Sequence, residues 1–232
     1  MSASGAATDA TVRPGSPRPA TPVNYSEARE RMVREQIEAR GIADARVLQA
    51  MRDVPRDAFV PDRLKSHAYD DRALPIEADQ TISQPYIVAL MVEAAAIAPN
   101  NKVLEVGAGS GYAAAVLSRL AREVIAIERH AELADLASVR LAALGYTNVR
   151  IVTGDGTRGL PREAPFDAIL IPAAAAEPPQ ALLGQLAEGG RLVMPVGGSL
   201  YQTLVRLTRT PAGFVRDDLG HVAFVPLVAD RD

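Results

Sequence analysis

A chain of 232 residues, 48% of them hydrophobic, is long and apolar enough to form one large domain with a buried core. Its formal net charge of −3 offers no overall positive field to a nucleic-acid backbone, and its apolar stretches are too short to span a bilayer, so we expect neither partner. The absence of cysteine excludes disulfides, thiolate nucleophiles and zinc–cysteine sites, and we expect a cytoplasmic protein.

The N-terminal part is predicted to begin with a disordered tail and to continue with two helices. Residues 1–23 are mostly Ala, Ser, Thr, Pro and Gly, with too few large apolar side chains to offset the entropy of ordering. Helices are predicted over residues 25–41 and 43–55, where apolar side chains recur at helical spacing. Residues 56–85, rich in Pro and Asp, are predicted to be irregular, and an irregular segment of this length is typical of functional loops.

From Pro85 onward, the sequence alternates between strands and helices. Pro85 is expected in the first turn of a helix over residues 85–98 capped by Ser83 or Gln84, because proline loses no hydrogen bond there. Strands are predicted at 102–107, 123–128, 149–155, 166–172 and 190–197, and helices at 112–121, 130–145 and 179–190. This alternation predicts an α/β fold: a mostly parallel sheet with helices on both faces, preceded by an N-terminal helical extension.

Glycines and acids follow the ends of three successive strands. Gly107, Gly109 and Gly111 come after the first strand, where a bare main chain lets a ligand or a helix approach closely. Glu128 ends the next strand, ~20 residues farther on, an offset at which a carboxylate reaches a ribose diol. Asp155 ends the third. Because the carboxyl ends of parallel strands meet at one edge of the sheet, these residues outline an adenosine pocket.

Two kinds of adenosine ligand compete for this pocket. A dinucleotide would require glycine where the chain has Tyr112, and its pyrophosphate would lie beside Glu105. S-adenosylmethionine carries a sulfonium and an ammonium and no phosphate, so it fits an acidic pocket better. Simpler structural roles stay open: the glycine turn in packing, Glu128 as a solvated helix cap, and Asp155 in an Asx turn with Gly156.

Nine segments together resemble the protein-L-isoaspartate O-methyltransferases, a family that uses S-adenosylmethionine to methylate abnormal isoaspartyl residues in ageing proteins. They are VPRDAFVP, AYDDRALPI, QTISQPYIVALM, VLEVGAGSGYAAAVLSRL, VIAIER, NVRIVTGDGTRGLP, APFDAILIPAAA, LLGQLAEGGRLVMPVG and FVPLV. The glycine loop and GGRLV occur throughout class I methyltransferases, whereas the stretch from VPRDAFVP through TISQP points to this family. The resemblance covers about Met32 to Val228.

The resemblance implies a Rossmann-like class I methyltransferase fold for residues 24–232. N-terminal helices and a substrate or lid segment would occupy 24–98, and a cofactor-binding α/β core 99–232. It also implies S-adenosylmethionine as the cofactor, S-adenosylhomocysteine as its product, and isoaspartyl-containing proteins and peptides as substrates. We expect a monomer.

The resemblance also assigns roles to individual residues. Ser83 of TISQP matches the active-site serine, placed between the transferable methyl and the substrate carboxylate, although a helix cap is its simpler role. Glu128 matches the ribose ligand, and Asp155 with Gly156 the contacts to adenine. The expected cofactor-binding set is Thr81, Ile82, Ser83, Glu105, Gly107, Gly109, Gly111, Glu128, Arg129, Asp155 and Gly156. The peptide is expected to be held partly through main-chain groups near TISQP and FVPL.

One departure from the family concerns Pro172, which stands where the family usually has threonine and so removes an N–H and a hydroxyl.

The chemistry itself requires no general base, because a carboxylate is already ionised at neutral pH. His67, His130 and His221 are therefore not expected to act as bases. Two alternatives stay open: esterification of a normal Asp in a dedicated partner peptide, and a non-catalytic module that binds S-adenosylmethionine. No metal is expected.

Overall fold

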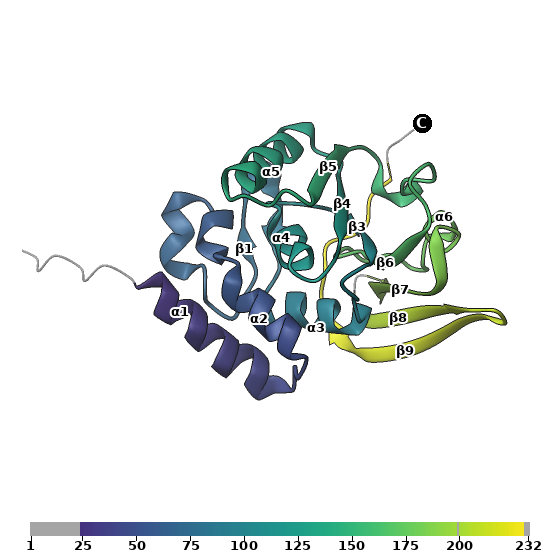
Figure 1. Ribbon diagram of the computed structural model, residues 1–232, viewed down its shortest axis with the longest axis horizontal. Coiled ribbons are helices and arrows are strands. Elements are labelled where there is room, and N and C mark those ends of the chain that lie inside the picture. The colour runs from purple at the N-terminus through teal and green to yellow at the C-terminus, as the bar shows by residue number, and fades with distance from the viewer. Residues whose placement is uncertain (1–23, 199, 230–232) are drawn as a thin grey trace, which may run out of the picture.

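The computed structural model describes residues 24–198 and 200–229. A seven-stranded sheet forms its centre, with strand order β5-β4-β3-β6-β7-β8-β9 (Figure 1). The strands are β3 Lys102–Val106, β4 Glu123–Glu128, β5 Val149–Thr153, β6 Phe166–Leu170, β7 Leu186–Gly197, β8 Gln202–Thr210 and β9 Gly213–Val222. The five strands from β3 to β7 are parallel, which confirms the predicted sheet, and β8 and β9 add an antiparallel hairpin at one edge.

The predicted helices are present, with changed bounds. They are α1 Tyr25–Arg31, α2 Ala45–Asp53, α3 Pro85–Ala95, α4 Tyr112–Ser118, α5 Ala131–Ala143 and α6 Gln180–Leu183. The helix that begins as α1 continues as a π-helical stretch, Met32–Ile37, and a 3-10 turn, Glu38–Arg40. It ends at Gly41, whose φ of 99° suits glycine, as the sequence predicts.

The prediction of a helix over residues 179–190 is wrong for its second half. The helix stops at Leu183, and Leu186 already belongs to β7. Pairing with β6 explains the difference. Gly184 is the C-cap of α6, the Gln185 carbonyl accepts a hydrogen bond of 2.9 Å from the amide of Phe166, and Leu186 pairs with Phe166, so the chain joins the sheet directly after the helix.

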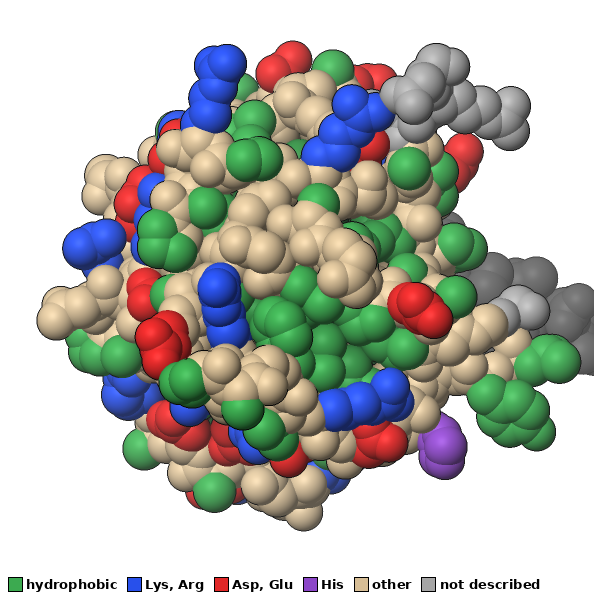
Figure 2. Space-filling model, turned by 90° about the vertical axis from the view of Figure 1, so that its right-hand side faces the viewer, with side chains coloured by type: hydrophobic (Ala, Val, Ile, Leu, Met, Phe, Trp, Pro, Cys, Tyr) green, Lys and Arg blue, Asp and Glu red, His purple; other side chains and the backbone are tan. Residues whose placement is uncertain are grey.

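The two faces of the sheet are covered unequally. Val103 and Val124 point into one core cluster, which holds the buried residues of α2, α3, α4 and α5. Leu104 and Ile125, the next residues along the same strands, point into a second cluster, which α6 covers. On the side of the molecule that carries α6 and the β8–β9 turn, hydrophobic side chains gather in a hollow framed by charged ones (Figure 2).

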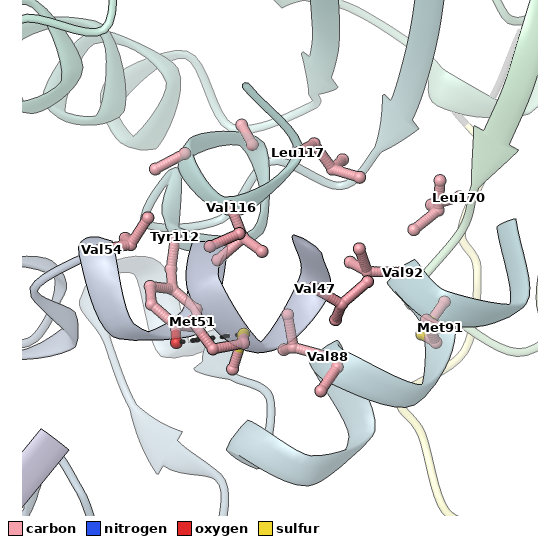
Figure 3. Close-up of a cluster of buried hydrophobic side chains, with 14 of the residues drawn as sticks. Val47, Met51, Val54, Val88, Met91, Val92, Tyr112, Val116, Leu117 and Leu170 are labelled. Atoms are coloured by element: carbon pink, nitrogen blue, oxygen red, sulfur yellow. Dashed lines mark hydrogen bonds between the residues drawn. The ribbon is translucent and has the colours of Figure 1, made fainter. Parts of the chain in front are cut away.

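The N-terminal helices share the core of the sheet. Figure 3 shows side chains of α2, α3 and α4 pointing toward one another, and the Tyr112 hydroxyl lies 3.8 Å from the sulfur of Met51. Between α2 and α3, the irregular stretch contains short 3-10 turns and a two-stranded antiparallel sheet, β1 Leu74–Pro75 with β2 Thr81–Ile82. The predicted tail, residues 1–23, lies outside the described residues.

Candidate active site

A cavity of about 1100 Å³ opens beyond the carboxyl ends of β3 and β4. It is lined by the glycine loop after β3, by the segment around β2, by the start of α3, and by the C-terminal residues 219–228. Of the predicted site residues, it brings together Thr81, Ile82, Ser83, Glu105, Gly107, Gly109, Glu128, Arg129 and Gly156. The parallel strands account for the residues that follow β3 and β4, because their carboxyl ends meet here, whereas Thr81, Ile82 and Ser83 reach the cavity from β2 of the separate two-stranded sheet.

Glu105 gives the cavity an acidic floor. It is the fourth residue of β3 and only 1% exposed, and its Oε2 atom has no hydrogen-bond partner among the described residues. Burial and, secondarily, the charge of Glu128 raise the pKa of Glu105 well above the ordinary value of a glutamate. A cation placed beside this carboxylate would compensate the missing interaction.

Glu128, the last residue of β4, holds the glycine loop. Its Oε2 accepts a hydrogen bond of 2.9 Å from the amide of Gly109, and its Oε1 accepts one of 3.0 Å from the amide of His130. Glu128 is only 4% exposed, so the interpretation as a solvated cap does not apply. The amides of Gly107 and Ala108 both donate to the Ile127 carbonyl, so β4 fixes the loop at three points.

The other glycines and Asp155 differ in what they contact. Gly111, with a φ of 88°, precedes α4, and a Cβ there would lie 3.1 Å from Leu141 of α5, so this glycine permits close helix packing. It does not line the cavity, and neither does Asp155. Asp155 caps a 3-10 turn by accepting hydrogen bonds from the amide and hydroxyl of Thr157. Gly156 does line the cavity, and a Cβ there would collide with Val106 at 2.4 Å.

Ser83 follows β2 and faces the cavity. The N-cap of α3 is Gln84, whose side chain makes no capping hydrogen bond, and Pro85 is the first helical residue. No described residue hydrogen-bonds the Ser83 hydroxyl, so the simpler role as a cap does not account for it. The next residue, Gln84, is tied to the preceding segment, because its side-chain amide donates a hydrogen bond of 2.7 Å to Oδ1 of Asp71.

Sequence reasoning missed the β8–β9 hairpin and the way it holds the C-terminal segment. Residues 225–227 form a parallel bridge with Ala174, with backbone hydrogen bonds of 2.8 and 2.7 Å. Gln202, the first residue of β8, accepts a bond of 2.7 Å from the amide of Phe224 and donates one of 3.0 Å to its carbonyl. The threonines and valine of QTLVRLTRT, which favour strands, and the glycine at position 213 are the signals that could have predicted this hairpin.

The parallel sheet that ends in an antiparallel hairpin, the glycine loop after β3 and the acid at the end of β4 define a class I S-adenosylmethionine-dependent methyltransferase. The sequence places the chain within one family of that class. Residues 27–232 match the family model described as Protein-L-isoaspartate(D-aspartate) O-methyltransferase (PCMT), and the chain belongs to this family.

Similar proteins cover almost the whole chain. It is 60% identical over 204 residues to a protein-L-isoaspartate O-methyltransferase of Methylorubrum extorquens (strain PA1), across 88% of this chain and 89% of that protein. It is 56% identical over 210 residues to protein-L-isoaspartate O-methyltransferase 1 of Rhodopseudomonas palustris (strain HaA2), across 90% and 86%. A Plasmodium falciparum structure named for the same activity, in complex with S-adenosyl-L-homocysteine, superposes with a TM-score of 0.76 at 27% identity, across 87% and 99%.

No group of three His, Cys, Asp or Glu that could hold a metal ion occurs among the described residues. Within the same part of the chain, no helix is long and apolar enough to cross a membrane.

Proposed function

We propose that this protein transfers a methyl group from S-adenosylmethionine to the free carboxylate of L-isoaspartyl residues in damaged proteins and peptides. The next backbone amide nitrogen then attacks the ester carbonyl and expels methanol, which gives a succinimide. Water opens this ring in part to normal aspartate, so methylation initiates repair. Family membership supports the proposal, and the structural observation that carries it is the meeting of Ser83 with Glu105 and Glu128 in one cavity.

The residues present fit the cofactor. The unpartnered carboxylate oxygen of Glu105 suits a cationic group, and the bare main chain at Gly107 and Gly109 leaves room for a ligand to approach closely. Both Glu128 and Gly156 line the cavity, and we assign to Glu128 the hydrogen bonds from the ribose diol and to Gly156 the contact with adenine. When bound, S-adenosylmethionine supplies an activated methyl group on a positively charged sulfur.

The chain's own contribution is alignment and the exclusion of water. The substrate carboxylate is already ionised, so no residue must remove a proton from it. We assign to the Ser83 hydroxyl, which lines the cavity, the task of holding this carboxylate in line with the methyl carbon. The segment around β2 and residues 224–227 face the cavity together, and their main-chain groups can hold a peptide without selecting its side chains. Proximity of this kind contributes up to ~7–11 kcal/mol.

Paired peptides test the proposal. Two peptides that differ only in isoaspartate against aspartate at one position are incubated with the enzyme and labelled S-adenosylmethionine. We expect label in the isoaspartyl peptide alone. Equal labelling of both would exclude isoaspartate recognition, and labelling of the aspartyl peptide alone would favour a dedicated Asp methyltransferase.

Pro172 is the observation behind that second candidate, because it lines the cavity where the family usually has threonine. The Pro172→Thr variant separates the two functions: restored isoaspartyl activity with lost activity on a normal aspartyl peptide would support the alternative.

We further infer a monomeric, cytoplasmic enzyme that binds neither nucleic acid nor membrane. Light scattering during size-exclusion chromatography tests the monomer.

A further inference from the structure

The hairpin formed by β1 and β2 lies over the glycine loop. Its tip, residues 76–80, is closed by a hydrogen bond of 2.8 Å from the Ile76 amide to the Gln80 carbonyl. The Ile76 side chain fills the space above Gly109, where an added Cβ would lie 3.5 Å from Cδ1 of Ile76. The same hairpin leads directly into Ser83, so its tip and the active-site serine move as neighbours on one short element.

Arg140 of α5 joins this tip to the glycine loop. Its Nη1 donates a hydrogen bond of 2.8 Å to the carbonyl of Ser110, a residue of the loop that lines the cavity. Its Nη2 lies 3.5 Å from Oε1 of Glu77 at the hairpin tip. The Arg140 side chain is 17% exposed and that of Glu77 is 32% exposed, so water screens this pair less than it screens the surface ion pairs.

The backbone of the tip is strained. Ala78 has a φ of 55° and Asp79 a φ of 54°, in the left-handed region that costs energy for any residue with a Cβ. Such a conformation persists only where its surroundings enforce it. The contact between Glu77 and Arg140 is the ion pair that anchors the tip to α5, and its loss would let the two residues relax.

We propose that Arg140 is a positioning residue that clamps the hairpin tip onto the glycine loop and thereby sets how long the nucleoside product stays bound. Through Ser110 it fixes the loop, and through Glu77 it fixes the hairpin that carries Ser83. Opening of the Glu77–Arg140 contact, helped by the strain at Ala78 and Asp79, detaches the hairpin tip from α5 and from the glycine loop, and this opening lets S-adenosylhomocysteine leave. This inference rests on the proposed function, because it assumes that this nucleoside occupies the cavity.

Three variants and one control test the clamp. Glu77→Gln weakens only the attachment of the hairpin, whereas Arg140→Met removes both contacts. Ala78→Gly relieves the strain and keeps Arg140 in place. Arg150→Met removes an ion pair with Glu163 on the surface, where the side chains are 49% and 35% exposed, and serves as the control.

The measurement is the dissociation rate constant of S-adenosylhomocysteine from the immobilised full-length chain. We expect Glu77→Gln to raise it by about two- to fivefold, the size expected for one lost ion pair, and Arg140→Met to raise it further. Ala78→Gly should lower it, since the clamped form no longer carries the strain. The control should not change it. If these residues had a structural role only, their variants would have lower melting temperatures, but Glu77→Gln and Ala78→Gly would not change the dissociation rate constant in opposite directions.

Unchanged rate constants in Glu77→Gln and Ala78→Gly would overturn the inference, even if Arg140→Met failed to fold. Absence of S-adenosylhomocysteine binding would overturn both the inference and the proposed function. A chain that binds this nucleoside with the expected changes in rate, but labels aspartyl and isoaspartyl peptides equally, would keep the clamp and refute the proposed substrate.

Discussion

The amide of Gly109 donates a hydrogen bond of 2.9 Å to Oε2 of Glu128, across 19 positions of sequence. The contact joins the end of β4 to the loop that follows β3, and the second oxygen of Glu128 accepts a bond from His130 at the start of α5. One buried carboxylate therefore sets the shape of the glycine loop while it faces the cavity. A ligand that adds a hydrogen bond to Glu128 meets a group that the main chain already holds in place.

Replacement of Glu128 should separate its role in shaping the glycine loop from its proposed role in binding the cofactor. In Glu128→Ala, two backbone amides lose their acceptor and the proposed contact with the ribose is lost, whereas Glu128→Gln keeps one side-chain oxygen for the Gly109 amide. A lost acceptor for a buried donor costs about 1–3 kcal/mol. We expect both variants to bind S-adenosylhomocysteine more weakly in calorimetry, with a larger fall in melting temperature in Glu128→Ala, which leaves both amides without an acceptor, than in Glu128→Gln, which leaves only the His130 amide without one. Equal affinity in the wild type and Glu128→Gln would argue against the ribose contact.

The Ser83 hydroxyl should act on the transfer step. Because Gln84 and not Ser83 is the N-cap of α3, Ser83→Ala should change the free energy of unfolding by no more than about 0.5 kcal/mol. We expect turnover of an isoaspartyl peptide to fall by roughly 10- to 100-fold, since one aligning hydrogen bond to a charged group contributes about 1.5–3 kcal/mol. The affinity for S-adenosylhomocysteine should change little. Ser83→Thr, which keeps a hydroxyl, is the control, and a parallel loss of stability and affinity would indicate a folding role.

How far the sequence predicts this site depends on the range of each interaction. Gly107, Gly109, Glu105 and Glu128 were predictable because they follow strands whose periodicity is local, and parallel strands bring their ends together. The roles of Arg140 and Gln202 were not, since each depends on contacts between segments more than twenty residues apart. The prediction of cofactor contacts for Asp155 and Gly111 stays untested, and the structure gives both residues structural contacts as well.

The same reasoning applies to the fold. The alternation from β3 to β7 was predicted because buried parallel strands are continuous apolar runs. The hairpin of β8 and β9 escaped prediction because β9 is mostly exposed and its sequence, GFVRDDLGHV, shows little apolar alternation. In residues 179–190, the apolar pattern favoured a helix, but the pairing of Gln185 and Leu186 with Phe166 of β6 makes the second half of this segment a strand.

The buried carboxyl of Glu105 should make stability depend on pH in a direction opposite to the usual one for carboxylates. Its pKa in the folded protein is raised by burial, so the folded state holds a proton that the unfolded state has already lost. The free energy of unfolding therefore falls as the pH rises from the ordinary glutamate range toward this raised pKa. Glu105→Gln should remove that decrease, so its gain in melting temperature over the wild type should grow as the pH rises above the ordinary glutamate range.

The same substitution should weaken cofactor binding, because the amide cannot compensate a cationic ligand. We expect S-adenosylmethionine to bind Glu105→Gln roughly 10- to 100-fold more weakly, from the ~1.5–3 kcal/mol of a charged hydrogen bond. Chemical or thermal unfolding of the cofactor-free protein and calorimetry of the complex measure the two effects separately. A variant less stable than the wild type at every pH would contradict the assignment of the raised pKa to Glu105.

The two hydrogen bonds between Gln202 and the backbone of Phe224 should affect how the enzyme binds its peptide substrate. Gln202 is 8% exposed and bonds both the amide and the carbonyl of Phe224, so it fixes the segment that the family resemblance implies in peptide binding. In Gln202→Met both backbone groups lose their partner, which should cost about 1–3 kcal/mol of stability. We expect KM for an isoaspartyl peptide to rise several-fold while the affinity for S-adenosylhomocysteine changes little.

Gln185 provides the matched control. It is 5% exposed and also bonds backbone groups through both side-chain atoms, accepting from the Leu160 amide and donating to the carbonyls of Arg158 and Ala181. Gln185→Met should therefore cost a similar amount of stability and leave KM for the peptide unchanged. If both variants raised KM equally, the change would reflect general loosening of the fold. A rise confined to Gln202→Met would locate peptide binding at the segment that contains Phe224, because only that substitution detaches it from β8.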